Sequence, residues 1–148
     1  MAIRDDVARD TKEAMRDRDK GRVTALRMIS AALKNAEIEK GQPLNDDEEM
    51  AVLRRQVKQR EESAEAYRKA GREEQAEAET REAEMVRVYL PTPLSDEELE
   101  ALVDQAIAET GATSMREMGA VMGRANAVAA GRADGRKLSG VVRSRLQG

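Results

Sequence analysis

The sequence has 148 residues, a net charge of −3, and neither cysteine nor histidine. These absences exclude disulfides, thiolate nucleophiles, histidine general bases and most zinc sites. Only 1% of the residues are aromatic, which disfavours a β-sheet. More than half are Ala, Glu, Lys, Leu or Arg, a composition typical of long helices. We therefore expect an all-α protein.

The charge is unevenly distributed along the chain. Residues 112–148 carry seven basic and two acidic side chains, a net charge of +5, so the remaining residues carry −8. A basic tail on an acidic body favours a polyanionic partner. The candidate nucleic-acid contacts are Arg116, Arg124, Arg132, Arg136, Lys137, Arg143 and Arg145.

Helical periodicity first predicts two helices, over residues 4–18 and 22–40. Gly21 is expected to leave the first helix in a left-handed conformation. The second helix carries a wide apolar stripe and is expected to be the most buried. The predicted inner face of the first helix consists of Val7, Ala8, Thr11, Ala14, Met15 and Arg18.

Two further helices are predicted over residues 46–70 and 72–89. Asn45 and Glu48 have the spacing of a capping box at the start of the third. Its inner positions keep heptad spacing from Met50 to Tyr67. The many glutamates of the fourth helix favour a solvated face over an acidic binding site.

The segment Leu90-Pro91-Thr92-Pro93-Leu94 is the clearest boundary, because its prolines favour extended backbone. We expect an N-terminal helical hairpin or bundle over residues 1–90, a linker over 91–94 and a three-helix domain over 95–148.

The predicted helices of the C-terminal domain begin near residues 96, 114 and 136. Ser95 with Glu98, and Ser114 with Glu117, match the capping-box pattern. The methionines at 115, 118 and 122 fit core packing better than an adaptable docking surface.

The turn from Gly131 to Gly135 precedes the last helix and offers backbone N–H groups to an anion. An equally good interpretation makes Asp134 a simple helix cap and the nearby arginines solubilising groups.

No motif indicates independent catalysis. The sequence contains no Gly-x-Ser-x-Gly elbow, phosphate-binding loop or dinucleotide fingerprint. We expect no cofactor and no metal site. No apolar run approaches a membrane span, and no signal core opens the chain, so we expect a cytoplasmic protein without membrane contact.

Two kinds of partner remain. Scarce aromatic residues argue against base stacking on single strands, so an RNA partner would be folded RNA recognised by shape and backbone. The alternative is a protein-interaction or assembly factor, suggested by the heptad spacing and the methionines.

Several segments resemble the YqeY family, in order and over essentially the whole chain. They are Leu26–Lys40, Arg60–Ser63, Tyr67–Arg72, Tyr89–Pro91, Gly111–Met115, Met118-Gly119 and Gly131–Gly135.

The resemblance implies an all-α, two-domain protein whose C-terminal part is similar to the tail domain of GatB. That subunit belongs to the glutamine-dependent amidotransferase that converts misacylated Glu-tRNA or Asp-tRNA, and its tail helps to hold tRNA. Gly131-Arg132-Ala133 corresponds to a Gly-Lys-Ala turn there. The family often carries a carbon–nitrogen ligase label, but this chain lacks the GatB catalytic cradle. The resemblance therefore implies a tRNA-associated module that needs an amidotransferase or another protein for any catalysis.

Overall fold

The computed structural model describes residues 2–147, which form seven α-helices and no strand. The expected all-α class is confirmed. The chain divides into two compact units, Met1–Leu90 and Pro91–Gly148. The helices are α1 (Ile3–Arg16), α2 (Lys20–Lys40), α3 (Asp46–Lys69), α4 (Glu73–Arg87), α5 (Asp96–Thr110), α6 (Met118–Ala129) and α7 (Gly135–Gln147).

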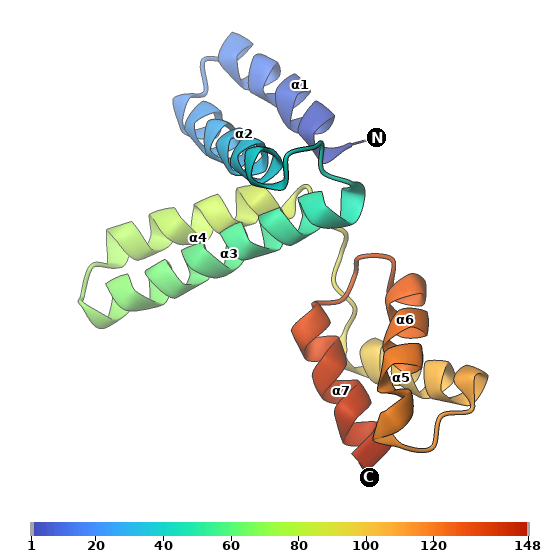
Figure 1. The fold of residues 1–148 in the computed structure, drawn as a ribbon. Coiled ribbons are helices and arrows are strands. Elements are labelled where there is room, and N and C mark those ends of the chain that lie inside the picture. The colour runs from blue at the N-terminus through green and yellow to red at the C-terminus, as the bar shows by residue number, and fades with distance from the viewer. Residues whose placement is uncertain (1, 148) are drawn as a thin grey trace. The chain divides into compact units, whose positions relative to one another are not determined.

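In the first unit, α1 pairs with α2 and α3 pairs with α4 (Figure 1). Capping explains where α2 ends and where α3 begins. The Asn45–Glu48 capping box is present, and Gly41 leaves α2 in the left-handed region at φ 81°. The core joins the α1–α2 pair to the N-terminal part of α3 and the C-terminal part of α4. Its buried members include Val7, Ile29, Leu33, Leu53 and Val86.

The predicted junction between the first two helices is wrong in detail. Arg18, at φ 55°, takes the left-handed conformation, whereas Gly21 lies inside α2. Asp19 explains the shift, because its side chain accepts the backbone N–H of Arg22 and starts α2 early. The predicted inner face of α1 is also too wide, since only Val7 and Ala14 are buried and Met15 is 53% exposed.

Two polar contacts tie α1 to distant parts of the first unit. Glu49, in the first turn of α3, is 1% exposed and accepts the backbone N–H groups of Ile3 and Arg4. Tyr89 donates its hydroxyl to Asp10 at 2.5 Å. Burial and the hydrogen bond to Asp10 raise the pKa of Tyr89 above its usual range. The heptad spacing of the sequence predicted neither the Glu49 contact nor the Tyr89 contact.

The second unit is built from α5, α6 and α7 around a separate core. Its buried side chains include Leu99, Val103, Val121, Leu138 and Val142. The Ser95–Glu98 capping box starts α5, and Gly111 ends it in the left-handed region at φ 70°. No helix in the described part of the chain is long and apolar enough to cross a membrane.

The predicted cap of the sixth helix is wrong. Ser114 makes no capping hydrogen bond, and a short 3-10 turn at Met115–Glu117 precedes α6. Glu117 instead accepts the backbone N–H of Thr113 at 2.8 Å. Of the methionines, Met118 and Met122 pack against the core and Met115 is 37% exposed.

Candidate nucleic-acid interface

The turn between α6 and α7 begins with two residues in the left-handed region, Ala130 at φ 48° and Gly131 at φ 83°. Asp134 then caps α7, because its Oδ1 accepts the backbone N–H of Arg136 at 2.9 Å. A carboxylate therefore already occupies part of the N-terminal end of α7, where an external anion was expected. Gly135 is the first residue of α7.

Arg132 holds the start of the second unit against this turn. Its Nε donates to the carbonyl of Thr92 at 2.8 Å, and its own carbonyl accepts the N–H of Leu94 at 2.9 Å. Glu98 lies 4.0 Å from the guanidinium. Arg132 is thus part of the scaffold that joins the Pro91–Leu94 segment to the α6–α7 turn.

Ion pairs join α7 to α5. Lys137 lies 2.5 Å from Asp96, and Arg145 lies 2.9 Å from Asp104 and 3.9 Å from Glu100. The hydrogen bond to Asp104 raises the pKa of Arg145. The three acids follow one another at intervals of four, so they lie on one face of α5.

A further pair joins α6 to the end of α5, where Arg124 contacts Glu109 at 2.5 Å. The hydrogen bond from Arg124 is the main reason that the pKa of Glu109 is lowered, with a second contribution from Gln105. These side chains are at least one-third exposed, so the pairs are accessible to solvent and salt.

Three of the seven candidate cations have no ion-pair partner in residues 2–147, namely Arg116, Arg136 and Arg143. All three are exposed. Arg136 and Arg143 lie seven residues apart on α7, with Gly140 between them on the same face. A Cβ at Gly140 would meet nothing within 4 Å, so this face lies open.

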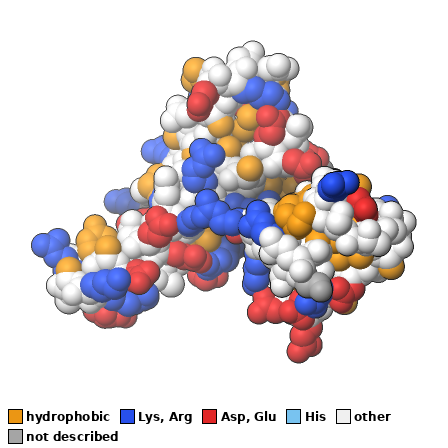
Figure 2. All heavy atoms as spheres, turned by 60° about the horizontal axis from the view of Figure 1, so that its bottom comes forward, with side chains coloured by type: hydrophobic (Ala, Val, Ile, Leu, Met, Phe, Trp, Pro, Cys, Tyr) orange, Lys and Arg blue, Asp and Glu red, His pale blue; other side chains and the backbone are white. Residues whose placement is uncertain are grey.

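The positive charge of residues 112–148 is balanced within the second unit. Six acidic side chains of α5 join Glu117 and Asp134, so the unit holds eight acids against seven bases, a net charge of −1. In the surface view, Lys and Arg side chains are interspersed with Asp and Glu side chains over the face drawn (Figure 2). The candidate interface therefore consists of individual arginines without an ion-pair partner among residues 2–147, and the second unit is not uniformly basic.

The sequence reasoning missed the acids of α5 that pair with the basic tail. A usable signal was present, because Asp96, Glu100 and Asp104 share one helical face. Counting charge over 112–148 left that helix out. The described residues contain no group of three or more acids placed to hold a metal ion.

A sequence model of the family described as Yqey-like protein matches residues 4–146. The chain belongs to this family. This membership, suggested by the motifs, covers both units.

Two curated relatives are similar to this family member, and both are named altered inheritance of mitochondria protein 41, mitochondrial. The protein of Pyrenophora tritici-repentis is 31% identical over 128 residues, which cover 84% of this chain and 69% of the relative. The protein of Clavispora lusitaniae is 36% identical over 92 residues, which cover 61% of this chain and 54% of the relative. The match thus spans about two-thirds of the first relative and about half of the second.

Proposed function

We propose that this YqeY-family protein is a non-catalytic RNA-binding module that associates with folded RNA such as tRNA. Its place would be beside a glutamine-dependent tRNA amidotransferase, whose active site another chain supplies. The supporting observation is the pair of exposed, unpaired arginines at positions 136 and 143 on one face of α7.

Of the seven cations expected to contact RNA, three are better placed to do so than the other four. Arg116, Arg136 and Arg143 can approach phosphates without first breaking an ion pair. Arg124, Lys137 and Arg145 would have to leave carboxylates of α5, and Arg132 would have to leave the Thr92 carbonyl. Guanidinium groups suit phosphate recognition because their planar donors match two phosphate oxygens at once.

The alternative of a protein-assembly factor has less support. Leu53, Val57 and Ala64, which gave α3 its heptad spacing, are buried within the first unit. Met118 and Met122 pack against the core of the second unit. Neither these α3 residues nor these two methionines are exposed enough to form an interface with a partner protein. The expected cytoplasmic location stays a prediction.

The test is a tRNA titration of the full chain at about 50 mM and about 200 mM salt. Wild-type affinity should fall as salt rises, because phosphate binding releases counterions. The double variant Arg136→Glu with Arg143→Glu should weaken binding and reduce the magnitude of the salt slope by about 2. Arg132 is left unchanged because its substitution would also break the contact with Thr92.

A matched control is Arg16→Glu with Arg81→Glu, which changes the net charge equally in the first unit. Both residues are exposed and have no ion-pair partner among residues 2–147. The control should retain more tRNA affinity than the α7 variant. Equal losses in the two variants, or binding that salt does not affect, would refute the proposal.

A further inference from the structure

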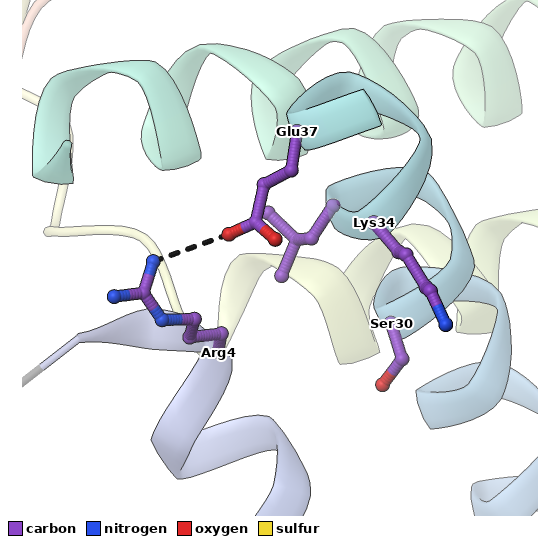
Figure 3. Close-up of a pocket in the computed structure, with 5 residues that line it drawn as sticks. Arg4, Ser30, Lys34 and Glu37 are labelled. Carbon is purple, nitrogen blue, oxygen red and sulfur yellow. Dashed lines mark hydrogen bonds and ion pairs between the residues drawn. The ribbon is translucent and has the colours of Figure 1, made fainter. Parts of the chain in front are cut away.

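A small surface hollow lies beside the N-terminal turn of α1, along the exposed side of α2. Its lining residues are Arg4, Ser30, Leu33, Lys34 and Glu37 (Figure 3). The last four follow the spacing i, i+3, i+4 and i+7, so they lie on one face of α2. They belong to the family-like segment Leu26–Lys40, to which the proposed RNA interface assigns no role.

Arg4 is held in place through only one of its nitrogens. Its Nη1 contacts Glu37 at 3.2 Å, the carbonyl of Leu44 at 3.3 Å and Glu49 at 4.0 Å. Guanidinium has five N–H donors on three nitrogens, and here Nε and Nη2 carry no contact to a described residue. Arg4 is therefore a fixed cation with donors to spare.

The α2 side of the hollow also offers unused polar groups. Lys34 has no ion-pair partner and the hydroxyl of Ser30 has no hydrogen-bond partner within residues 2–147. Glu37 pairs with Arg4 through Oε1, which leaves Oε2 without a partner in the same residues. Of the residues that line the hollow, only Leu33 is accounted for by core packing, since it is 3% exposed.

We propose that this hollow binds a phosphate ester that carries a neighbouring hydroxyl group, as a ribose phosphate does. Ser30 and Lys34, one turn apart on α2, donate to the phosphate oxygens at one end of the hollow (Figure 3). At the other end, Glu37 Oε2 accepts from the hydroxyl group, and the free nitrogens of Arg4 donate to its oxygen. Two cations against one carboxylate match an anion, and the carboxylate distinguishes a hydroxylated ester from a bare anion. The inference does not depend on the proposed RNA interface of the second unit.

The size of the hollow limits the ligand. Its volume is about 240 Å³, below the range of about 300–1,000 Å³ that is usual for drug-sized ligands. One sugar phosphate fits that volume better than a whole dinucleotide does. The hollow is open to solvent, so binding is expected to be weak and salt-sensitive.

The test follows backbone amide resonances of the full chain by NMR during titration with ribose 5-phosphate, inorganic phosphate or ribose. Ribose 5-phosphate should give saturable shifts at Ser30 and Lys34, with tighter binding than either fragment. Lys34→Ala should weaken binding about tenfold, because it removes a charge-assisted contact. Lys58→Ala is the matched control, since Lys58 is exposed on α3 and has no ion-pair partner in the described chain.

Glu37→Gln separates the two halves of the site. The amide can still accept from Arg4 but removes a negative charge, so inorganic phosphate should bind more tightly and the advantage of ribose 5-phosphate should shrink. The inference is overturned if no saturable shift occurs at Ser30 and Lys34, or if Lys34→Ala binds ribose 5-phosphate as Lys58→Ala does.

A titration of the same variants with tRNA identifies the source of the phosphate. If Lys34→Ala also lowers tRNA affinity relative to Lys58→Ala, the hollow takes a ribose phosphate unit of RNA. If it does not, the ligand is a free sugar phosphate. The sugar-phosphate titration tests the hollow, whereas the Arg136→Glu, Arg143→Glu variant tests the RNA interface of α7. Either proposal can therefore fail while the other holds.

Discussion

The carboxylate of Glu49 caps the first turn of α1 by accepting the backbone N–H of Arg4 at 3.1 Å, from a position 45 residues further along the chain. The residue before α1, Ala2, has no side chain that could cap it. Glu49 therefore supplies from α3 the acceptor that a local Ser or Asp usually provides. The side chain of Arg4 in turn contacts Glu37 of α2, so the pair joins three helices at one point.

Loss of this buried cap should destabilise the first unit. Glu49→Ala leaves the N–H groups of Ile3 and Arg4 without their acceptor in a partly buried position. The free energy of unfolding should fall by about 2 kcal/mol, the usual cost of leaving buried donors unsatisfied. Urea unfolding monitored by circular dichroism measures the change, and hydrogen exchange should show faster opening of α1.

Glu62→Ala is the matched control, because Glu62 is exposed on the same helix and has no ion-pair partner within residues 2–147. It should change the free energy of unfolding by less than about 0.5 kcal/mol. Equal effects of the two substitutions would contradict a capping role for Glu49.

Two serines with the same sequence pattern should respond differently to alanine. Ser95 accepts the N–H of Glu98 at 3.1 Å, whereas Ser114 makes no capping hydrogen bond. Ser95→Ala should lower the stability of the second unit by about 1 kcal/mol, and Ser114→Ala should have almost no effect. Thermal unfolding of the two variants checks this, and a reversed order would contradict the assigned caps.

Acid should weaken the same capping box. The backbone N–H of Ser95 lowers the pKa of Glu98 below its unfolded value of 4.5. The contribution of Glu98 to stability is therefore complete above that value and is lost as pH falls through the folded pKa. In Glu98→Gln this acid-dependent loss should be smaller than in the wild type, as urea unfolding over a series of acidic pH values would show.

The sequence predicted the helices well because their signals are local. The Asn45–Glu48 and Ser95–Glu98 boxes depend on neighbours three residues apart, and both are present. The Ser114–Glu117 pattern failed because Glu117 bonds to Thr113 instead. Arg18 replaced Gly21 as the left-handed residue because the side chain of Asp19 starts α2 early.

The candidate site was less predictable because it depends on contacts between distant segments. The pairing of Lys137 with Asp96 and of Arg145 with Asp104 appears only when α7 packs against α5. In the sequence, Glu49 is likewise only one of four acids in the first turn of α3. Its burial follows from the packing of α1 against α3. Helical spacing identifies a shared face but not the helix that covers it.

The Tyr89–Asp10 hydrogen bond should make the first unit sensitive to alkaline pH. Burial and Asp10 raise the folded pKa of Tyr89 above the unfolded value of 10.0. Its contribution is therefore complete below about pH 10 and declines as pH rises toward the folded pKa. Tyr89→Phe should cost about 1 kcal/mol at neutral pH, a figure already reduced for partial exposure to solvent.

The difference between wild type and Tyr89→Phe should shrink as pH rises above about 10, because the Tyr89 hydroxyl then ionises in the unfolded state but keeps its proton in the folded state. Urea unfolding of both proteins at several pH values from about 8 to about 11 measures the difference. A constant difference over that range would show that the hydroxyl of Tyr89 is not the group responsible.

The acids of α5 should restrain RNA binding by competing with phosphates for Lys137 and Arg145. Asp96→Asn with Asp104→Asn removes the closest partner of each cation and raises the net charge by two. Each exposed pair is worth about 0.2–1 kcal/mol, so loss of both pairs should raise tRNA affinity roughly twofold to thirtyfold. Glu62→Gln with Glu77→Gln gives the same change of charge in the first unit, on exposed residues, and should raise affinity less. If tRNA affinity rose equally in the two double variants, net charge alone would explain the effect. A loss of tRNA affinity in the α5 variant would mean that these ion pairs hold α7 in its RNA-binding geometry.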